Sequence, residues 1–216
     1  MDLFTQIVVT IGRVGPNGVS MLGTGFFVRN SGIIATPRHV VGDSDNGLVI
    51  LMPHINSFSQ YQDTTDTKCR LASVTIIESD PIRDIAILQA SDVQFDGRLP
   101  QIGNLDSIGV SQPIHIYGYP HCPEGRRVLT YQSADIGSKV LLESNGIKSK
   151  YAVINIQSRP GQSGSLIFCP RTNKIVGMLN GAYVPDGGGI SLAGINPHEL
   201  NQTTQCISAH YIEDML

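Results

Sequence analysis

Glycine and proline interrupt this sequence so often that no stretch keeps a helical hydrophobic period for ten residues. The 216 residues include 23 glycines and 12 prolines, and the runs between them are short and rich in β-branched and aromatic side chains. Only the tail, residues 208–216, fits a short helix, with Ser208 as its N-cap. Many short strands joined by tight turns predict an all-β fold built as a sandwich or as barrels.

The expected strands form two sets, separated by a turn-rich bridge at residues 90–112. The first set comprises residues 6–11, 25–29, 32–36, 48–52, 71–77 and 85–89. The second comprises residues 114–119, 128–136, 139–143, 152–156, 165–168, 175–179 and 190–193. A chain of this length can bury a core as one large domain or as two small barrels.

Composition narrows the class of protein. Hydrophobic residues make up 41% and charged residues 15%, with a net charge of −3 and no basic block. We therefore expect a globular protein that binds neither nucleic acid nor membrane. The first residues lack the basic and apolar regions of a signal peptide, which predicts a cytoplasmic location and favours free thiols. Without a CxxC pair we expect no metal and no cofactor; the cysteines are Cys69, Cys122, Cys169 and Cys206.

The segment 160–165, Pro-Gly-Gln-Ser-Gly-Ser, contains a candidate nucleophile. A serine hydroxyl attacks a carbonyl only if a base takes its proton and donors stabilise the resulting oxyanion. Gly161 lets the backbone turn so that its own N–H and that of Ser163 can converge. Gly164 leaves room for a substrate. Taken alone this pattern is also typical of an ordinary turn.

A base and a carboxylate precede that serine in the chain. His39 follows an expected strand, and a neutral imidazole is the side chain best suited to accept a proton near pH 7. Asp84 opens the apolar run 85–88, where a carboxylate needs a partner such as an imidazole N–H. Asp80 is the rival carboxylate, but it precedes Pro81, which favours a turn.

Five motifs in this order resemble the chymotrypsin/trypsin-like peptidase superfamily, and in particular the protease module of HtrA-type bacterial enzymes. They are Gly-Thr-Gly-Phe-Phe-Val at 23–28, Ala-Thr-Pro-Arg-His-Val-Val at 35–41, Asp-Ile-Ala-Ile-Leu at 84–88, Gly-Gln-Ser-Gly-Ser at 161–165 and Gly-Met-Leu-Asn at 177–180. The resemblance implies a double barrel of two six-stranded antiparallel sheets in a single peptidase domain. The barrels would span about 1–95 and 113–200, with a linker at 96–112, a tail at 201–216 and no PDZ domain.

The same resemblance implies a serine endopeptidase that forms an acyl-enzyme in a cleft between the barrels. The catalytic triad would be His39, Asp84 and Ser163, and the oxyanion hole would comprise Gly161, Gln162 and Ser163. Substrate-binding positions would be Gln157, Pro160, Asn180, Gly181 and Ala182. A latent, protease-like module that binds peptides is the alternative, and an esterase lacks its usual strand–helix nucleophile elbow here.

Departures from the family pattern predict how the protein is controlled. Gln162 replaces the aspartate that binds a newly cut amino terminus in the digestive members, so we expect no activation by N-terminal cleavage and control by a partner protein or by loop ordering instead. Ser165 replaces a second glycine, which bears on the catalytic rate.

Gln157 replaces the acidic residue that selects basic side chains, so we expect an uncharged P1 residue unless Asp186 overrides it. Protein or peptide substrates are the expected partners.

Overall fold

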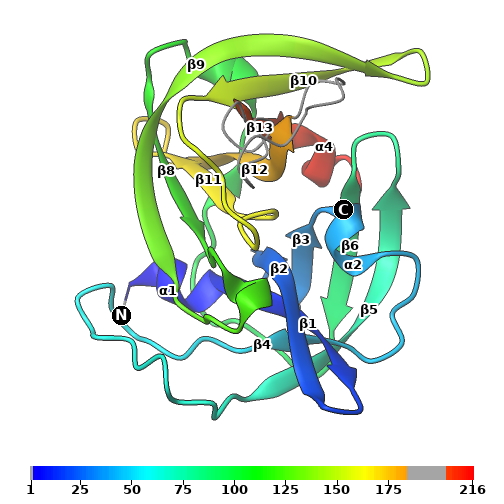
Figure 1. Ribbon diagram of the computed structural model, residues 1–216. Helices are drawn as coiled ribbons and strands as arrows, with labels where there is room; N and C mark the ends of the chain where they lie inside the picture. The colour runs from blue at the N-terminus through cyan, green and yellow to red at the C-terminus, as the bar shows by residue number, and fades with distance from the viewer. Residues whose placement is uncertain (1, 184–202) are drawn as a thin grey trace, which may run out of the picture.

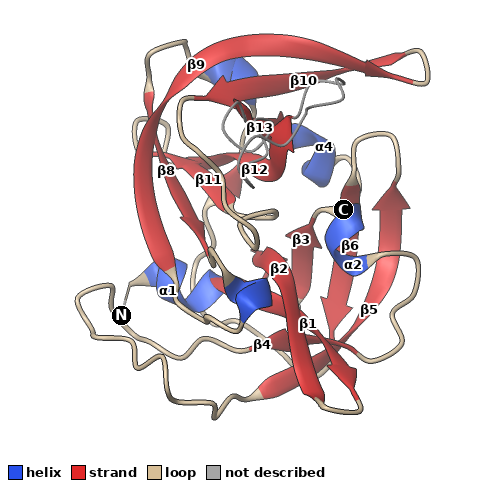
Figure 2. Ribbon diagram, viewed as in Figure 1, coloured by secondary structure: helices blue, strands red, loops and turns tan. Residues whose placement is uncertain are grey.

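The computed structural model describes residues 2–183 and 203–216, and its strands form two barrels (Figures 1 and 2). The first is a closed barrel in the order β1-β2-β3-β6-β5-β4. Its elements are α1 (Leu3–Ile7), β1 (Val8–Gly15), β2 (Gly18–Arg29), β3 (Ile33–Thr36), α2 (Arg38–Val41), β4 (Leu48–Leu51), β5 (Leu71–Asp80) and β6 (Ile85–Ala90).

The second barrel contains the rest of the described chain. Its sheet runs β11-β8-β9-β10-β13-β12-β7, and an additional β11–β12 pairing closes six of these strands on themselves. Its elements are β7 (Gln101–Ile102), η1 (Leu105–Ser107), β8 (Pro113–Gly118), η2 (Cys122–Glu124), β9 (Thr130–Ser144), β10 (Ile147–Ile154), β11 (Leu166–Cys169), β12 (Lys174–Tyr183), β13 (Thr203–Ser208) and α4 (His210–Glu213). The prediction of two six-stranded antiparallel barrels with a short C-terminal helix is confirmed.

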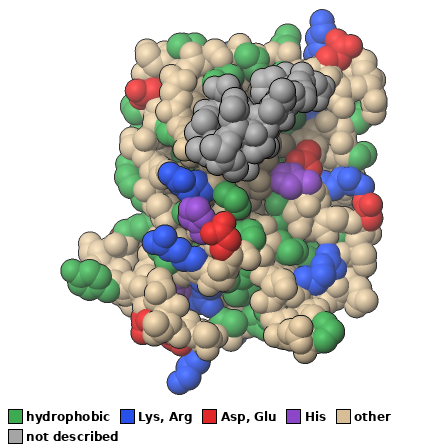
Figure 3. All heavy atoms as spheres, viewed as in Figure 1, with side chains coloured by type: hydrophobic (Ala, Val, Ile, Leu, Met, Phe, Trp, Pro, Cys, Tyr) green, Lys and Arg blue, Asp and Glu red, His purple; other side chains and the backbone are tan. Residues whose placement is uncertain are grey.

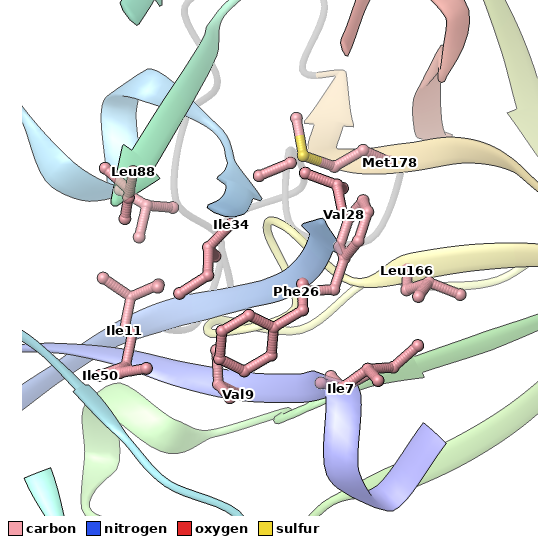
Figure 4. Close-up of a cluster of buried hydrophobic side chains, with 14 of the residues drawn as sticks. Ile7, Val9, Ile11, Phe26, Val28, Ile34, Ile50, Leu88, Leu166 and Met178 are labelled. Atoms are coloured by element: carbon pink, nitrogen blue, oxygen red, sulfur yellow. The ribbon is translucent and has the colours of Figure 1, made fainter. Parts of the chain in front are cut away.

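Buried aliphatic and aromatic side chains hold the barrels together. Figure 4 shows Phe26 and Ile34 of the first barrel in one cluster with Leu166 and Met178 of the second. All four side chains are fully buried. Because burial of apolar surface is the main stabilising contribution in folding, this shared core fixes the two barrels against each other.

Several predicted elements were wrong in their bounds. The strands predicted at 128–136 and 139–143 are one strand, β9, which begins at Thr130, because Gly137 occupies a bulge opposite β10 and does not end the strand. The chain begins with the short helix α1, where strand was expected from residue 6. In α1 the backbone carbonyl of Asp2 accepts hydrogen bonds from the amide and hydroxyl of Thr5, at 3.0 and 2.7 Å.

The C-terminal part also departs from prediction. Strand β13 was not predicted, and Ser208 is its last residue and not a helix N-cap. Helix α4 starts at His210 after Ala209, and the Ser208 hydroxyl instead accepts the Leu105 N–H at 3.0 Å. The strand expected at residues 190–193 lies outside the described residues.

Two further observations concern membrane-spanning helices and the cysteines. No helix within residues 2–183 and 203–216 has the length and apolar character needed to cross a bilayer. All four cysteines are free, with Cys69 exposed and the others buried.

Candidate active site

His39 and Asp84 meet at one end of the first barrel. His39 lies in α2, directly after β3, and Asp84 directly precedes β6, the strand that pairs with β3. The Asp84 carboxylate contacts the imidazole Nδ1 of His39 at 2.5 Å and accepts the His39 backbone N–H at 2.8 Å. Two contacts from one carboxylate fix both the ring and the start of α2.

A strained turn presents that carboxylate. Asp84 has a φ of 57°, in the left-handed region that costs a non-glycine residue free energy. The preceding turn is held by Asp80, whose carboxylate accepts the backbone N–H groups of Ile82 and Arg83 and the guanidinium of Arg83 at 2.7 Å. Arg83 in turn lies over the ring of Tyr211 in α4, 4.4 Å from its centroid. Asp80 therefore stabilises the turn and does not contact His39.

Asp80 should make stability depend on acidity. Burial by itself would raise the pKa of Asp80, but hydrogen bonds from Arg83 and Ile82 outweigh it and lower the pKa. A lowered folded-state pKa stabilises the fold above the unfolded value of about 3.9, and this contribution is lost as the pH falls through the folded value. We expect Asp80→Asn to cost about 1 kcal/mol of unfolding free energy at pH 6 and progressively less below pH 4 in urea titrations. A cost that is the same at pH 6 and pH 3 would contradict this.

Ser163 lies on the loop that leads into β11, between the barrels. Its hydroxyl is half-buried and donates to the backbone carbonyl of Asn180 at 3.2 Å. Asn180 also donates through its side-chain amide to the Asp84 carboxylate at 3.4 Å. Asn180 therefore contacts Ser163 and Asp84 at once. Among the hydrogen bonds of the described residues, none joins Ser163 to His39.

The loop before Ser163 leaves two backbone donors unused. Within the described part of the chain, the N–H groups of Gly161 and Ser163 donate to no acceptor. Gly161 has a φ of 87°, and a Cβ there would lie 2.6 Å from the Tyr119 carbonyl, so only glycine fits. Unpaired N–H groups are rare in a protein interior. The two N–H groups are therefore candidate donors to an anionic oxygen.

Gln162 and Ser165 brace the same loop. Gln162 is buried, and its side chain donates to Gln132 at 2.5 Å and accepts the Arg159 N–H at 2.8 Å. The Ser165 hydroxyl is fully buried and donates to the Gln162 carbonyl at 2.7 Å. Ser165 therefore directs its hydroxyl into the loop.

The hydroxyl of Ser165 occupies the space that a side chain at Gly118 would need. A Cβ at Gly118 would lie 1.9 Å from Ser165 Oγ. We expect Gly118→Ala to lower the free energy of unfolding by about 1–3 kcal/mol. Adding Ser165→Gly should recover part of that loss, since it removes the clashing atom. Urea denaturation of both single variants and the double variant measures the coupling; strictly additive effects would show that the two positions do not clash.

The expected substrate-binding positions lie around this loop. Asn180, Gly181 and Ala182 belong to β12, which pairs with β11 only as far as Met178, so its continuation presents an edge that β11 leaves uncovered. Pro160 and Gln157 are exposed on the segment before Ser163. Asp186 lies outside the described residues, so the predicted P1 preference stays a prediction.

Residues that sequence reasoning missed surround Gly161. Thr24 of β2 donates its hydroxyl to the Gly161 carbonyl at 2.8 Å, and the His121 N–H binds the Pro160 carbonyl at 2.6 Å. The Cys122 thiol lies 4.0 Å from the Gly161 carbonyl, and burial raises its pKa to about 12, so it is protonated. In the sequence, Thr24 stands between Gly23 and Gly25 in the first of the five motifs.

Histidines and acidic side chains form ion pairs in and near the site. On the face in Figure 3, histidines lie beside acidic side chains, and the described residues contain two such ion pairs, His39–Asp84 and His121–Glu124. No group of three His, Cys, Asp or Glu side chains suited to a metal occurs among the residues that the structure describes.

Comparison with known proteins finds similarity to peptidases. The model of the trypsin-like peptidase domain matches residues 23–178. A probable periplasmic serine endoprotease, DegP-like, of Bartonella henselae is 24% identical over 79% of this chain, which spans only 30% of that protein.

Two solved structures share the fold. The active form of the Rv3671c protease from M. tuberculosis is 19% identical, with a TM-score of 0.69 over 99% of this chain and 80% of that one. The apo MamO protease domain from Magnetospirillum magneticum is 15% identical, with a TM-score of 0.68 over 99% of this chain and 97% of that one.

Proposed function

This chain belongs to the trypsin-like peptidase domain family. On that premise we propose that it is a serine protease that cleaves peptide bonds with His39, Asp84 and Ser163. The observation that carries the proposal is the contact of His39 Nδ1 with Asp84 beside the loop of Ser163. In that loop the N–H groups of Gly161 and Ser163 donate to no acceptor among the described residues. Each part has a distinct task in acyl transfer.

Asp84 sets the proton positions on the imidazole. Its carboxylate accepts the Nδ1 proton of His39, which leaves the Nε2 lone pair free to act as a base. His39 takes the Ser163 proton as Ser163 Oγ attacks the scissile carbonyl, and the carbonyl oxygen becomes an oxyanion. The N–H groups of Gly161 and Ser163 stabilise that oxyanion. His39 then protonates the leaving amine, and water hydrolyses the acyl-enzyme by the same steps.

Substrate binding would also release the nucleophile. Asn180 O, which accepts the Ser163 hydroxyl in the free protein at 3.2 Å, belongs to the β12 edge proposed to pair with the substrate backbone. A substrate N–H that takes this carbonyl frees the hydroxyl to donate to His39. Gln157 and Pro160 would border the P1 residue, which we propose to be uncharged.

Activation would not require a cleavage that creates a new amino terminus. Gln162 is uncharged and already bonded to Gln132, so it offers no carboxylate to a terminal amine. We propose that a protein partner or ordering of the substrate loops regulates activity. We also propose a protein or peptide substrate and no nucleic-acid or membrane partner. We propose a cytoplasmic location for this chain, in contrast to the B. henselae relative, which is described as periplasmic.

A second candidate is a latent module that binds peptides without cutting them. The Ser163 hydroxyl bonded to Asn180, and not to His39, favours it. If substrate binding does not redirect that hydroxyl, the protein retains a peptide-binding edge but no nucleophile.

Labelling with a fluorophosphonate separates the two candidates. The active protease should form one phosphonyl adduct, located at Ser163 by peptide mapping, and should cut a peptide library after uncharged residues. A folded protein that is neither labelled nor able to cleave any library member, while still binding peptides, would support the latent module.

A further inference from the structure

Thr24 joins the first barrel to the nucleophile loop of the second. It is fully buried in β2, and three of its hydrogen bonds cross to the other barrel. Its N–H donates to the Ser163 carbonyl at 2.9 Å, and its hydroxyl donates to the Gly161 carbonyl at 2.8 Å. The same hydroxyl accepts the Tyr119 N–H at 3.0 Å. The Thr24 hydroxyl thus both donates and accepts, and its orientation is fully determined.

Thr24 thus binds the carbonyls of the same two residues, Gly161 and Ser163, whose N–H groups donate to no acceptor among the described residues. In a trans peptide the C=O and N–H point in opposite directions. The Pro160 carbonyl is held by the His121 N–H at 2.6 Å, so the Gly161 N–H points away from His121. The next peptide is held at its Gly161 carbonyl by Thr24, which limits rotation of the backbone between Gly161 and Ser163.

Nothing else on the loop holds the Gly161 carbonyl as directly. The other polar contact to it among the described residues is the Cys122 thiol at 4.0 Å, a weak donor. Removal of the Thr24 hydroxyl therefore leaves this buried carbonyl without a strong donor and the Tyr119 N–H without its acceptor. An unpaired buried carbonyl is costly, so we expect the Gly161–Gln162 peptide to shift toward a new donor, against the hydrogen bond of 3.0 Å from its Gln162 N–H to the Arg159 carbonyl.

We propose that Thr24 is a positioning residue whose hydroxyl holds the Gly161 peptide so that the N–H groups of Gly161 and Ser163 face the developing oxyanion. Thr24 touches no reacting atom and acts through Gly161. The inference rests on the proposed function, because it assigns a task to the same oxyanion site. It places a determinant of the catalytic rate in the barrel that does not contain the nucleophile.

Thr24→Val and Thr24→Ser form the decisive pair. Valine keeps the branched shape but removes the hydroxyl, whereas serine keeps the hydroxyl and removes a methyl group. We expect Thr24→Val to lower kcat about 10- to 100-fold, since a small misplacement of catalytic donors has effects of this size. KM should change little, and the rate of fluorophosphonate labelling should fall in parallel. Thr24→Ser should restore most of both rates.

Thr10→Val is a matched control in the neighbouring strand. Thr10 of β1 pairs directly with Thr24, is fully buried, and its hydroxyl has no hydrogen-bond partner among the described residues. The same chemical change there removes no bond. We therefore expect wild-type kcat and labelling from Thr10→Val, with each assay run well below the Tm of every variant.

The outcomes separate this inference from the proposed function. If Ser163→Ala is inactive while Thr24→Val keeps wild-type kcat, or Thr24→Ser is as slow as Thr24→Val, the role of the hydroxyl is overturned and the protease assignment stands. If Ser163→Ala still cleaves, the proposed site is wrong and the role of Thr24 is overturned with it. A slow Thr24→Val with an active Thr24→Ser and Thr10→Val supports the inference.

Discussion

Replacing Ser163 with alanine should abolish peptide cleavage and fluorophosphonate labelling while leaving the fold intact. The variant loses the only atom proposed to attack the carbonyl, and removal of a nucleophile in this kind of site lowers kcat by about 10⁶-fold. The structural cost is small, because the half-buried hydroxyl makes one hydrogen bond of 3.2 Å to Asn180. Hydrolysis of a peptide substrate, labelling and thermal unfolding measure the three effects.

Ser165→Ala is the control for this change. Ser165 stands two residues away on the same loop, but its hydroxyl is fully buried and already donates to the Gln162 carbonyl. It should keep a fluorophosphonate adduct at position 163. Labelling that persists in Ser163→Ala, or that disappears only in Ser165→Ala, would show that the nucleophile is a different residue.

Asp84→Asn should lower kcat about 10⁴-fold with little change in fold. Asparagine keeps an oxygen that can accept the His39 backbone N–H, so the start of α2 survives. At the other position an amide replaces the carboxylate oxygen 2.5 Å from His39 Nδ1. That amide donates a hydrogen, so Nδ1 must accept and Nε2 carries the proton. In that tautomer the imidazole cannot take a proton from Ser163.

Asp80→Asn tests whether the effect belongs to Asp84 alone. Asp80 precedes Asp84 closely in the sequence, but its carboxylate accepts a hydrogen bond from Arg83 and does not contact His39. We expect a loss of stability with kcat within a few-fold of wild type, since only the turn is loosened. A larger fall in kcat for Asp80→Asn than for Asp84→Asn would reverse the two assignments. Steady-state kinetics at pH 8 and urea unfolding distinguish these results.

Prediction from sequence succeeded where the signal is local. Short runs of β-branched and apolar residues, bounded by glycine, proline and other turn residues, located most strands. It failed at Gly137, where a glycine in a bulge resembles a strand end, and at Leu3–Ile7, where one turn of helix is too short to show a period. Serine is a common helix N-cap, yet the Ser208 hydroxyl accepts a hydrogen bond from the backbone N–H of Leu105, far away in the sequence.

The strand pattern by itself determined an all-β fold, and the chemistry of the side chains singled out His39, Asp84 and Ser163 as candidates. The double barrel was implied by the resemblance of five ordered motifs to the trypsin-like peptidases. Only the tertiary structure decided that Asn180 contacts both Asp84 and Ser163, and that Thr24 of one barrel holds Gly161 of the other. Those contacts join residues up to 137 positions apart. A hydrogen bond depends on distance and direction in space, and neither is written in the order of residues.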